Sequence, residues 1–272
     1  MESHKIYCIS IYDETFDSIK KINCIPVGLG KNIKHNQWLR DNTNENISHK
    51  NKNYGELTFY YWFWKNMLRN IPDNHWVGFS QYRRHWKKNE KFEGKTKSFN
   101  DLVLKDIPKE WEKYETVLGE PINLEKIKFM KLLKHASSIL IKEPRFILKK
   151  NRNLRFNFEM MHGIEFLDKA ISQLDNENRD DFIKYLDCEK SLNPANMFIC
   201  KSKRKVDLFF NTLFSWLEKC EKIFDNSALE GYSQTRIYAF LSERFLPYWF
   251  KKNTKVLQWP LLYFDIRNQE SK

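Results

Sequence analysis

Short apolar runs alternate with amphipathic segments along this chain, and the alternation predicts its fold class. Six runs have the length and the β-branched or aromatic content of strands: Lys5–Ile11, Ile25–Gly28, His75–Ser80, Glu115–Gly119, Asn196–Lys201 and Val256–Phe264. Helical spacing recurs between them, in 57–68, 158–174, 179–186, 206–224 and a stretch that Ser233 would cap and that runs toward Lys251. Strands separated by helices indicate an α/β fold with helices on both faces of the sheet. We expect one domain over residues 1–272, with a mostly helical lobe at about 124–190.

The helix expected at 57–68 is unusually aromatic. One apolar face recurs at helical spacing, and it consists of Leu57, Tyr60, Tyr61, Trp64 and Leu68. Three more aromatic residues, Phe59, Trp62 and Phe63, lie off that face, so we expect the helix to be covered on more than one side. Asn51 or Asn53 would cap its start.

A double arginine follows the strand expected at His75–Ser80. The strand would deliver Gln81, Tyr82, Arg83 and Arg84 at its C-terminal end, where ligands of open α/β sheets bind. A guanidinium fork matches phosphate oxygens, so the pair is a candidate anion clamp. The alternative is two solvated arginines on a loop, because most charge runs are surface features.

The net charge of the chain limits the classes of partner that it could bind. The net charge is +12, which suits nucleic acid, an anionic membrane face or a phosphorylated substrate. No zinc-finger spacing, RNP-like run or basic region with heptads is present, so no nucleic-acid partner is expected. The segment 124–150 is basic and amphipathic, and its lysines offer a peripheral contact with an anionic membrane.

The cysteines and the N-terminal residues indicate the cellular compartment in which the protein is expected. The five cysteines are an odd number without paired spacing, which favours a reducing environment over a disulfide frame or structural zinc. The N-terminal residues lack the apolar stretch of a signal peptide. The longest apolar run, Leu57–Trp64, is too short to span a bilayer. We expect a cytoplasmic protein, peripheral at most to the inner membrane face.

Several motifs together resemble one protein family. They are Asn46-Ile47-Ser48, Lys50-Asn51, Tyr54, Glu56-Leu57-Thr58, Tyr61-Trp62, Trp64-Lys65-Asn66, Val77-Gly78, Tyr82-Arg83-Arg84, Asn196-Met197-Phe198-Ile199 and Phe240-Leu241-Ser242-Glu243-Arg244. The chain resembles the DUF4422 family of bacterial capsule, lipopolysaccharide and exopolysaccharide gene clusters, whose members are regarded as glycosyltransferases. The family commonly has His before Tyr-Arg-Arg, and this chain has Gln81, so imidazole chemistry is not available at that position.

The resemblance implies a GT-A-like nucleotide-sugar-binding fold and transfer of a sugar to a glycan or lipid-linked acceptor. Glycosyl transfer needs polar partners for the sugar hydroxyls, and we expect Asp41, Asn46, Ser48 and Asn51 to bind ribose or donor sugar. Loop and capping chemistry is the alternative for these four residues. Asn196 belongs to the late motif and is a further substrate-binding candidate.

The transferring enzyme would also need a base for the acceptor hydroxyl. Glu56, Glu243 and His162 are the candidates, and the sequence does not rank them. Glu56 is explained equally well by the dipole of the helix that it opens, and His162 by a satisfied core position. Arg244 lies on an apolar helix face, where it binds substrate or forms a structural ion pair.

The diphosphate charge of the leaving group must also be neutralised. Many nucleotide-sugar enzymes use a metal held by Asp-x-Asp, which this sequence lacks. Arginines can replace a metal in that role, so we expect Arg83 and Arg84 to act without a divalent cofactor. The rival function from another class is a non-catalytic carbohydrate- or RNA-binding module.

Overall fold

The computed structural model describes residues 4–88, 98–126 and 152–269, and a mixed β-sheet runs through these residues. Eight strands form it: β1 (His4–Ser10), β2 (Ile25–Gly28), β3 (Trp76–Gln81), β4 (Arg84–Trp86), β5 (Thr116–Gly119), β8 (Phe198–Cys200), β9 (Val256–Trp259) and β10 (Leu261–Tyr263). Two further strands of the described residues, β6 (Ile122–Asn123) and β7 (Ser191–Leu192), form a separate two-stranded sheet. The α/β prediction is confirmed.

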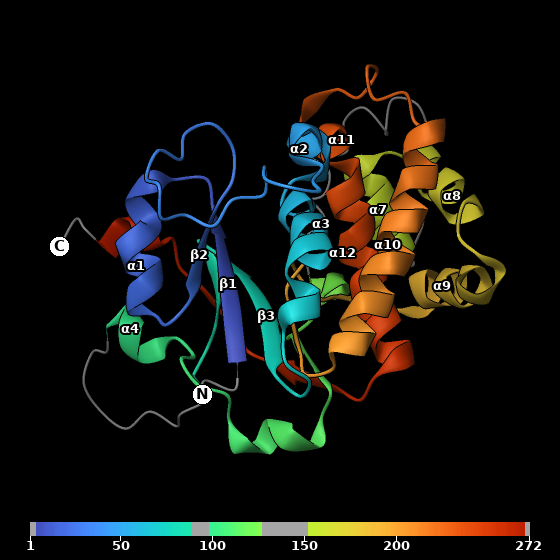
Figure 1. Cartoon of the computed structure of the whole chain (residues 1–272). Coiled ribbons are helices and arrows are strands. Elements are labelled where there is room, and N and C mark those ends of the chain that lie inside the picture. Colours follow the sequence, from blue (N-terminus) through green and yellow to red (C-terminus); the bar gives the residue numbers. More distant parts are fainter. Residues whose placement is uncertain (1–3, 89–97, 127–151, 270–272) are drawn as a thin grey trace.

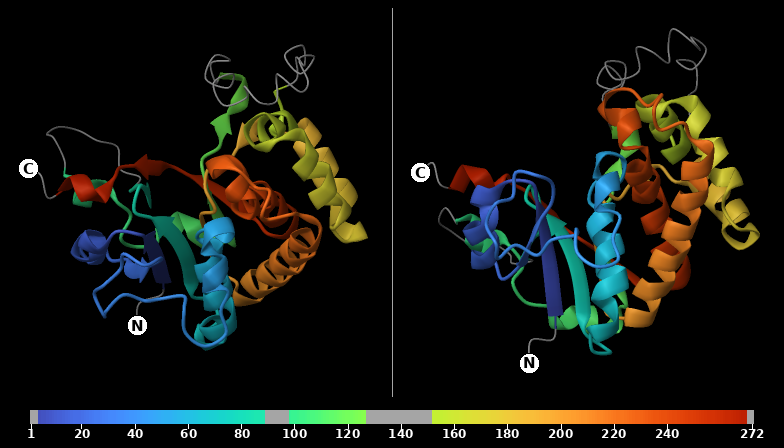
Figure 2. Two further views of the ribbon diagram at one scale, coloured as in Figure 1. Left: turned by 90° about the horizontal axis from the view of Figure 1, so that it is seen from above. Right: turned by 45° about the horizontal axis from the view of Figure 1, so that its top comes forward.

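The helices in the described residues flank this sheet. They are α1 (Phe16–Lys21), α2 (Asn51–Tyr54), α3 (Leu57–Asn66), α4 (Phe99–Leu102), α7 (Leu154–His162), α8 (Ile164–Ser172), α9 (Asn176–Cys188), α10 (Lys203–Ile223), α11 (Gly231–Thr235) and α12 (Ile237–Asn253). Figure 1 shows β1, β2 and β3 between α1 on one side and α3, α10 and α12 on the other. Seen from above, α8 and α9 lie outermost, beyond α10 and α12 (Figure 2).

The first three strands make the parallel part of the sheet. β1 is central and pairs in parallel with β2 on one edge and with β3 on the other. Side chains of β1 alternate between the faces: Tyr7 packs on Phe59 and Phe63 of α3, whereas Ile6 and Cys8 belong to the apolar cluster that contains α1. The connections β1–α1–β2 and β2–α3–β3 therefore cover opposite faces. The order β2-β1-β3 creates a topological switch point beyond the carboxyl ends of β1 and β3.

The rest of the sheet is mostly antiparallel. β8 lies between β3 and β5 and runs against both, while β5 and β9 are parallel. The sequence predicted one last strand at Val256–Phe264, which is wrong: it divides at Pro260, after which β10 pairs with β4 instead of β5. The three-residue β4, which the sequence did not predict, is thereby held between β3 and β10.

The aromatic helix α3 is enclosed on more than one side, as predicted. Leu57, Phe59, Tyr60 and Phe63 are fully buried between the sheet and the helices above it. On the outer side its Trp64 stacks on Phe214 of α10 at 5.8 Å between ring centroids. The helix ends at Asn66, so Leu68 belongs to a following 3-10 turn, Leu68–Asn70.

Residues 154–188 of the expected helical lobe form helices α7, α8 and α9, whereas 127–151 lie outside the described residues. The single helix expected at 158–174 is two helices, α7 and α8, separated by Gly163. Gly163 adopts φ +109°, a conformation that L side chains rarely take, and this ends α7. The basic segment 124–150 is described only as far as residue 126.

One expectation about α12 is corrected. Ser233 lies inside α11 and does not cap α12, whose N-cap residue is Arg236. Pro247 lies inside α12, which continues to Asn253. No helix of the described residues has both the length and the apolar character that crossing a membrane requires.

Candidate active site

A pocket of about 440 Å³ lies at the topological switch point. The sheet supplies one wall through residues that end or follow its parallel strands: Ile9, Ser10, Ile11, Tyr12, Leu29, Gln81, Tyr82, Arg83 and Arg84. Helices supply the other wall through Asn51, Gly55, Glu56, Tyr232 and Arg236. The predicted residues Asn51, Glu56, Tyr82, Arg83 and Arg84 are therefore brought together around one cavity.

The two adjacent arginines differ in their partners. Arg83 Nε donates to Asp265 Oδ2 at 3.0 Å, and about half of the Arg83 side chain is exposed. Hydrogen bonds from Arg267 and then Arg83 hold the pKa of Asp265 well below its usual range. Arg84 Nη1 donates to Gln81 Oε1 at 2.8 Å, and no carboxylate of the described residues forms an ion pair with it. Arg84 therefore brings to the pocket a positive charge that no carboxylate of the described residues contacts directly.

Glu56 supplies the pocket with a carboxylate. Its Oε1 accepts from Asn196 Nδ2 at 2.9 Å and, more weakly, from Gln81 Nε2 at 3.4 Å. Gln81 thus links the carboxylate to the guanidinium, since its Oε1 accepts from Arg84. Glu56 is the N-cap residue of α3, and its side chain makes no capping hydrogen bond, so the dipole of α3 is the helix-start explanation that stays open. The predicted caps Asn51 and Asn53 are wrong for α3, because Asn51 Nδ2 donates to Gly55 O and Thr58 Oγ1.

Three predicted residues form a buried network behind Glu56 instead of lining the pocket. Asn196 Nδ2 also donates to Ala239 O of α12 at 3.0 Å. The preceding residue, Ala195, donates its backbone N–H to Glu243 Oε1 at 2.6 Å, and the other oxygen of Glu243 accepts from Arg244. Arg244 is 1% exposed and also donates to Asn157 Oδ1 at 2.9 Å. The contacts of Arg244 are those of a structural ion pair, and both oxygens of Glu243 are engaged.

His162 is buried away from the pocket lining. Its ring stacks on Phe240 at 4.0 Å, and Nδ1 lies 3.0 Å from Ser233 O. Burial, together with the nearby Arg244, lowers the pKa of His162 to about 2. A neutral imidazole of such low basicity, without access to the cavity, does not fit the role of base that the sequence left open for it.

The polar loop before α3 contributes less than expected. Asn46 Oδ1 accepts from the N–H and hydroxyl of Ser48 at 3.1 and 2.8 Å, which is loop chemistry, and neither residue lines the pocket. Asp41 is 3% exposed and also lies outside the lining. Of the four predicted sugar ligands only Asn51 reaches the cavity.

Sequence reasoning missed two lining side chains on the helical wall. Tyr232 is 75% exposed, and Arg236 is half-buried at the junction of α11 and α12. No motif surrounds either residue, and their place depends on α11 returning to the α2–α3 turn. Tyr232 could have been recognised only as an exposed aromatic residue on a concave surface. The sequence does not reveal that exposure.

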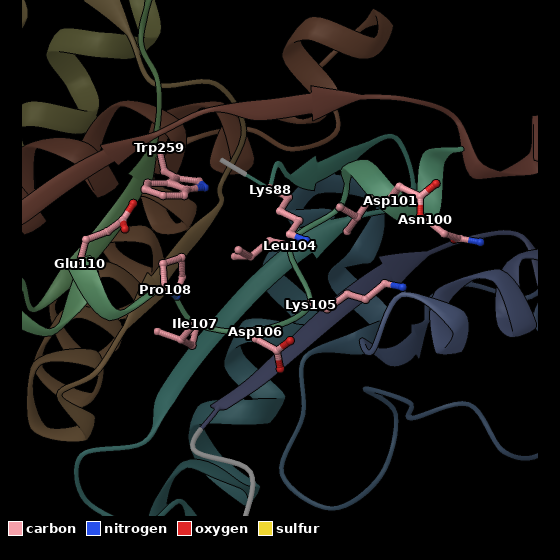
Figure 3. A pocket seen from close by; sticks show the side chains of 11 residues that line it. Lys88, Asn100, Asp101, Leu104, Lys105, Asp106, Ile107, Pro108, Glu110 and Trp259 are labelled. Carbon is pink, nitrogen blue, oxygen red and sulfur yellow. The ribbon is translucent and has the colours of Figure 1, made fainter. Parts of the chain in front are cut away.

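A second pocket, of about 520 Å³, lies beside α4 and β9 (Figure 3). Side chains of both signs line it, including Lys88, Asp101, Lys105, Asp106 and Glu110, together with Trp259. None of the predicted site residues reaches it, and its mixed charge favours no single ligand class. Within residues 4–88, 98–126 and 152–269, no three His, Cys, Asp or Glu side chains are grouped to hold a metal ion. Metal independence stays a prediction, because a bound nucleotide supplies its own metal ligands.

Comparison with known proteins identifies this fold and the family of the chain. The chain has the fold of a solved structure described as the apo form of WbbM, a bifunctional glycosyltransferase. The TM-score is 0.67 at 19% sequence identity over 97% of this chain, which spans 45% of that one. The family described as Domain of unknown function (DUF4422) matches residues 5–254, so the chain belongs to this family. No curated protein matches the chain.

Proposed function

We propose that this protein is a glycosyltransferase that moves a sugar from a nucleotide-sugar donor to a glycan or lipid-linked acceptor in bacterial surface polysaccharide biosynthesis. The observation that carries the proposal is the switch-point pocket, which combines Arg84, without an ion-pair partner among the described residues, with the carboxylate of Glu56. The shared fold with a bifunctional glycosyltransferase supports it. The site of action is the cytoplasm, with the basic segment 124–150 as a peripheral membrane contact.

In the proposed reaction, the carboxylate and the guanidinium groups of the pocket have separate tasks. The acceptor hydroxyl attacks the anomeric carbon, the bond from that carbon to the diphosphate oxygen breaks, and the bonding electrons leave with the diphosphate. Glu56 takes the proton of the acceptor hydroxyl. Guanidinium groups of the pocket neutralise the charge that develops on the diphosphate, which is the task of a metal in other enzymes. The reaction therefore needs no divalent cation.

The first experiment identifies the donor. A panel of nucleotide-sugars is screened by thermal shift, since a ligand that binds the native state raises its apparent stability. Release of free nucleotide is then measured with the selected donor, in excess EDTA and again with added manganese. Turnover that survives EDTA supports the proposal. Activity abolished by EDTA and restored by manganese would show that the metal-free step is wrong, and tight, salt-sensitive RNA binding without turnover would favour a binding module.

Variants then test the proposed roles. Arg84→Ala should slow transfer by about 10²- to 10³-fold, because it removes one charge contact of the transition state. Glu56→Gln should remove the pH dependence of turnover together with most of the rate, since the amide cannot accept a proton. The control is Arg204→Ala, which removes an exposed arginine in the first turn of α10 and should leave the rate unchanged. Full activity in Arg84→Ala and Glu56→Gln would return both residues to a structural role.

A further inference from the structure

Arg236 occupies a position that only a glycine at residue 55 allows. A Cβ atom added to Gly55 would lie 2.3 Å from Arg236 Nη1, so the guanidinium rests directly on the backbone between α2 and α3. Gly55 also adopts φ +58° and ψ −133°, a combination that disfavours L side chains. The chain thus holds an arginine against the turn that carries Glu56, on the helical wall of the pocket.

The side chain of Arg236 has no polar partner within the described part of the chain. It donates no hydrogen bond and forms no ion pair there, although it is half-buried. A guanidinium has five N–H donors, and those of Arg236 are not among the buried atoms without a partner, so they face the open pocket and can donate to the oxygen atoms of a ligand. Arg236 therefore has the properties of a ligand-binding cation.

The charges of the pocket identify the second member of a pair. Among the described residues, three arginines and one glutamate line it. Arg83 is already paired with Asp265, which also accepts two bonds from the Arg267 side chain. Arg84 and Arg236 have no carboxylate partner in the described residues, and they come from the two walls, β4 and the α11–α12 junction. A diphosphate carries at least two negative charges, and two guanidinium forks can each bind one phosphate group.

We propose that Arg84 and Arg236, and not the adjacent Arg83 and Arg84, bind the diphosphate of the donor. The inference rests on the proposed function, since it assigns the phosphate-binding residues of that same pocket. Arg83 shapes the rim by fixing the segment around Asp265. A diphosphate held by Arg84 and Arg236 connects the sheet to the helical layer.

The test measures binding of a nucleoside diphosphate without turnover. Uridine, guanosine, cytidine, adenosine and thymidine diphosphates are titrated calorimetrically into wild-type protein, and the tightest binder is used throughout. Arg84→Ala and Arg236→Ala should each weaken binding by about 10- to 100-fold, as expected for a charge-assisted contact. Arg83→Ala and the surface control Arg204→Ala should change binding less than about threefold. Arg236→Lys keeps the charge but loses the fork, and should restore part of the loss.

The outcomes separate this inference from the proposed function. A wild-type protein that binds none of these nucleotides and no nucleotide-sugar would overturn the proposed function itself. A wild-type protein that binds one of them, with Arg236→Ala equal to wild type or with Arg83→Ala as weak as Arg84→Ala, would overturn only the arginine assignment. The Tm of each variant without nucleotide is measured alongside. A folded Arg236→Lys with partial binding keeps the test valid where the alanine variant does not fold.

Discussion

At the scale of single residues, Asp41 shows how burial shifts an acid that the sequence placed among the sugar ligands. The side chain is 3% exposed, and its Oδ2 has no hydrogen-bond partner within the described residues. Burial raises the pKa of Asp41 above its ordinary value of 3.8, against the opposing effect of Thr58 in α3. The ionised carboxylate is therefore disfavoured in the folded protein.

We predict that Asp41→Asn stabilises the protein at neutral pH. Because the folded-state pKa is raised, the stability linked to this carboxyl is complete below pH 3.8 and is lost as pH rises through the folded value. The variant should show a higher Tm than wild type at pH 7.5, and the difference should disappear near pH 3.5. A variant that instead loses turnover at unchanged Tm would show that Asp41 binds substrate.

The residues of the pocket divide by what the sequence can reveal. Arg84 and Glu56 were predictable, because each follows or opens an element with a strong local pattern. Arg236 was not, since its role depends on contact with Gly55, which lies 181 positions earlier in the chain. Arg83 shows the converse, because its local sequence equals that of Arg84 and only its contact with Asp265 distinguishes the two.

At the scale of elements, α12 positions Glu56 through the loop that precedes β8. Ala195 in this loop has φ +63°, which costs a non-glycine residue about 1–2 kcal/mol. The hydrogen bond from the Ala195 N–H to Glu243 of α12 holds the loop in this conformation. Its neighbour Asn196 then holds Glu56 at 2.9 Å. Glu243 therefore acts on the pocket by positioning Glu56.

We predict that Glu243→Gln destabilises the protein without changing the pH profile of turnover. The variant keeps an oxygen for the Ala195 N–H but leaves the 1%-exposed Arg244 without a carboxylate, which should cost roughly 3–5 kcal/mol. Denaturant unfolding and the pH dependence of kcat measure the two effects. Glu218→Gln is the matched control, because its ion pair with Lys222 is exposed. A lost pH dependence with intact stability would make Glu243 the base.

Elements with strong local patterns were predictable, and those that depend on tertiary contacts were not. β1, β3 and β5 are apolar runs buried on both faces, so their composition reveals them. β4 has three residues and exists because Gln81 and the returning β10 pair with it. The break between α7 and α8 at Gly163 depends on one backbone angle, and the periodic apolar pattern of the sequence does not reveal it.

At the scale of the whole molecule, two buried histidines make the stability of the fold depend on pH. His85 of β4 places Nε2 3.2 Å from both Tyr82 O and Phe264 O, between the pocket segment and the end of the sheet. Burial lowers the pKa of His85 to about 4. His162, in the helical layer, has its pKa lowered to about 2, chiefly by burial. Both imidazoles are neutral in the folded protein, and both become protonated when the chain unfolds in mild acid.

We predict that mild acid weakens the whole fold. The unfolded chain binds more protons than the folded one between the lowered pKa values and the ordinary value of 6.5, so the free energy of unfolding falls as pH decreases through this window. From pH 7.5 to 5.5 each histidine should contribute a loss of about 1.4 kcal/mol, and both together about 3 kcal/mol. Urea unfolding at the two pH values measures the change. His162→Phe should remove about half of it, whereas His49→Gln, at an exposed position, should leave it intact. Equal stability at both pH values would show that the two imidazoles are solvated or already protonated in the folded state.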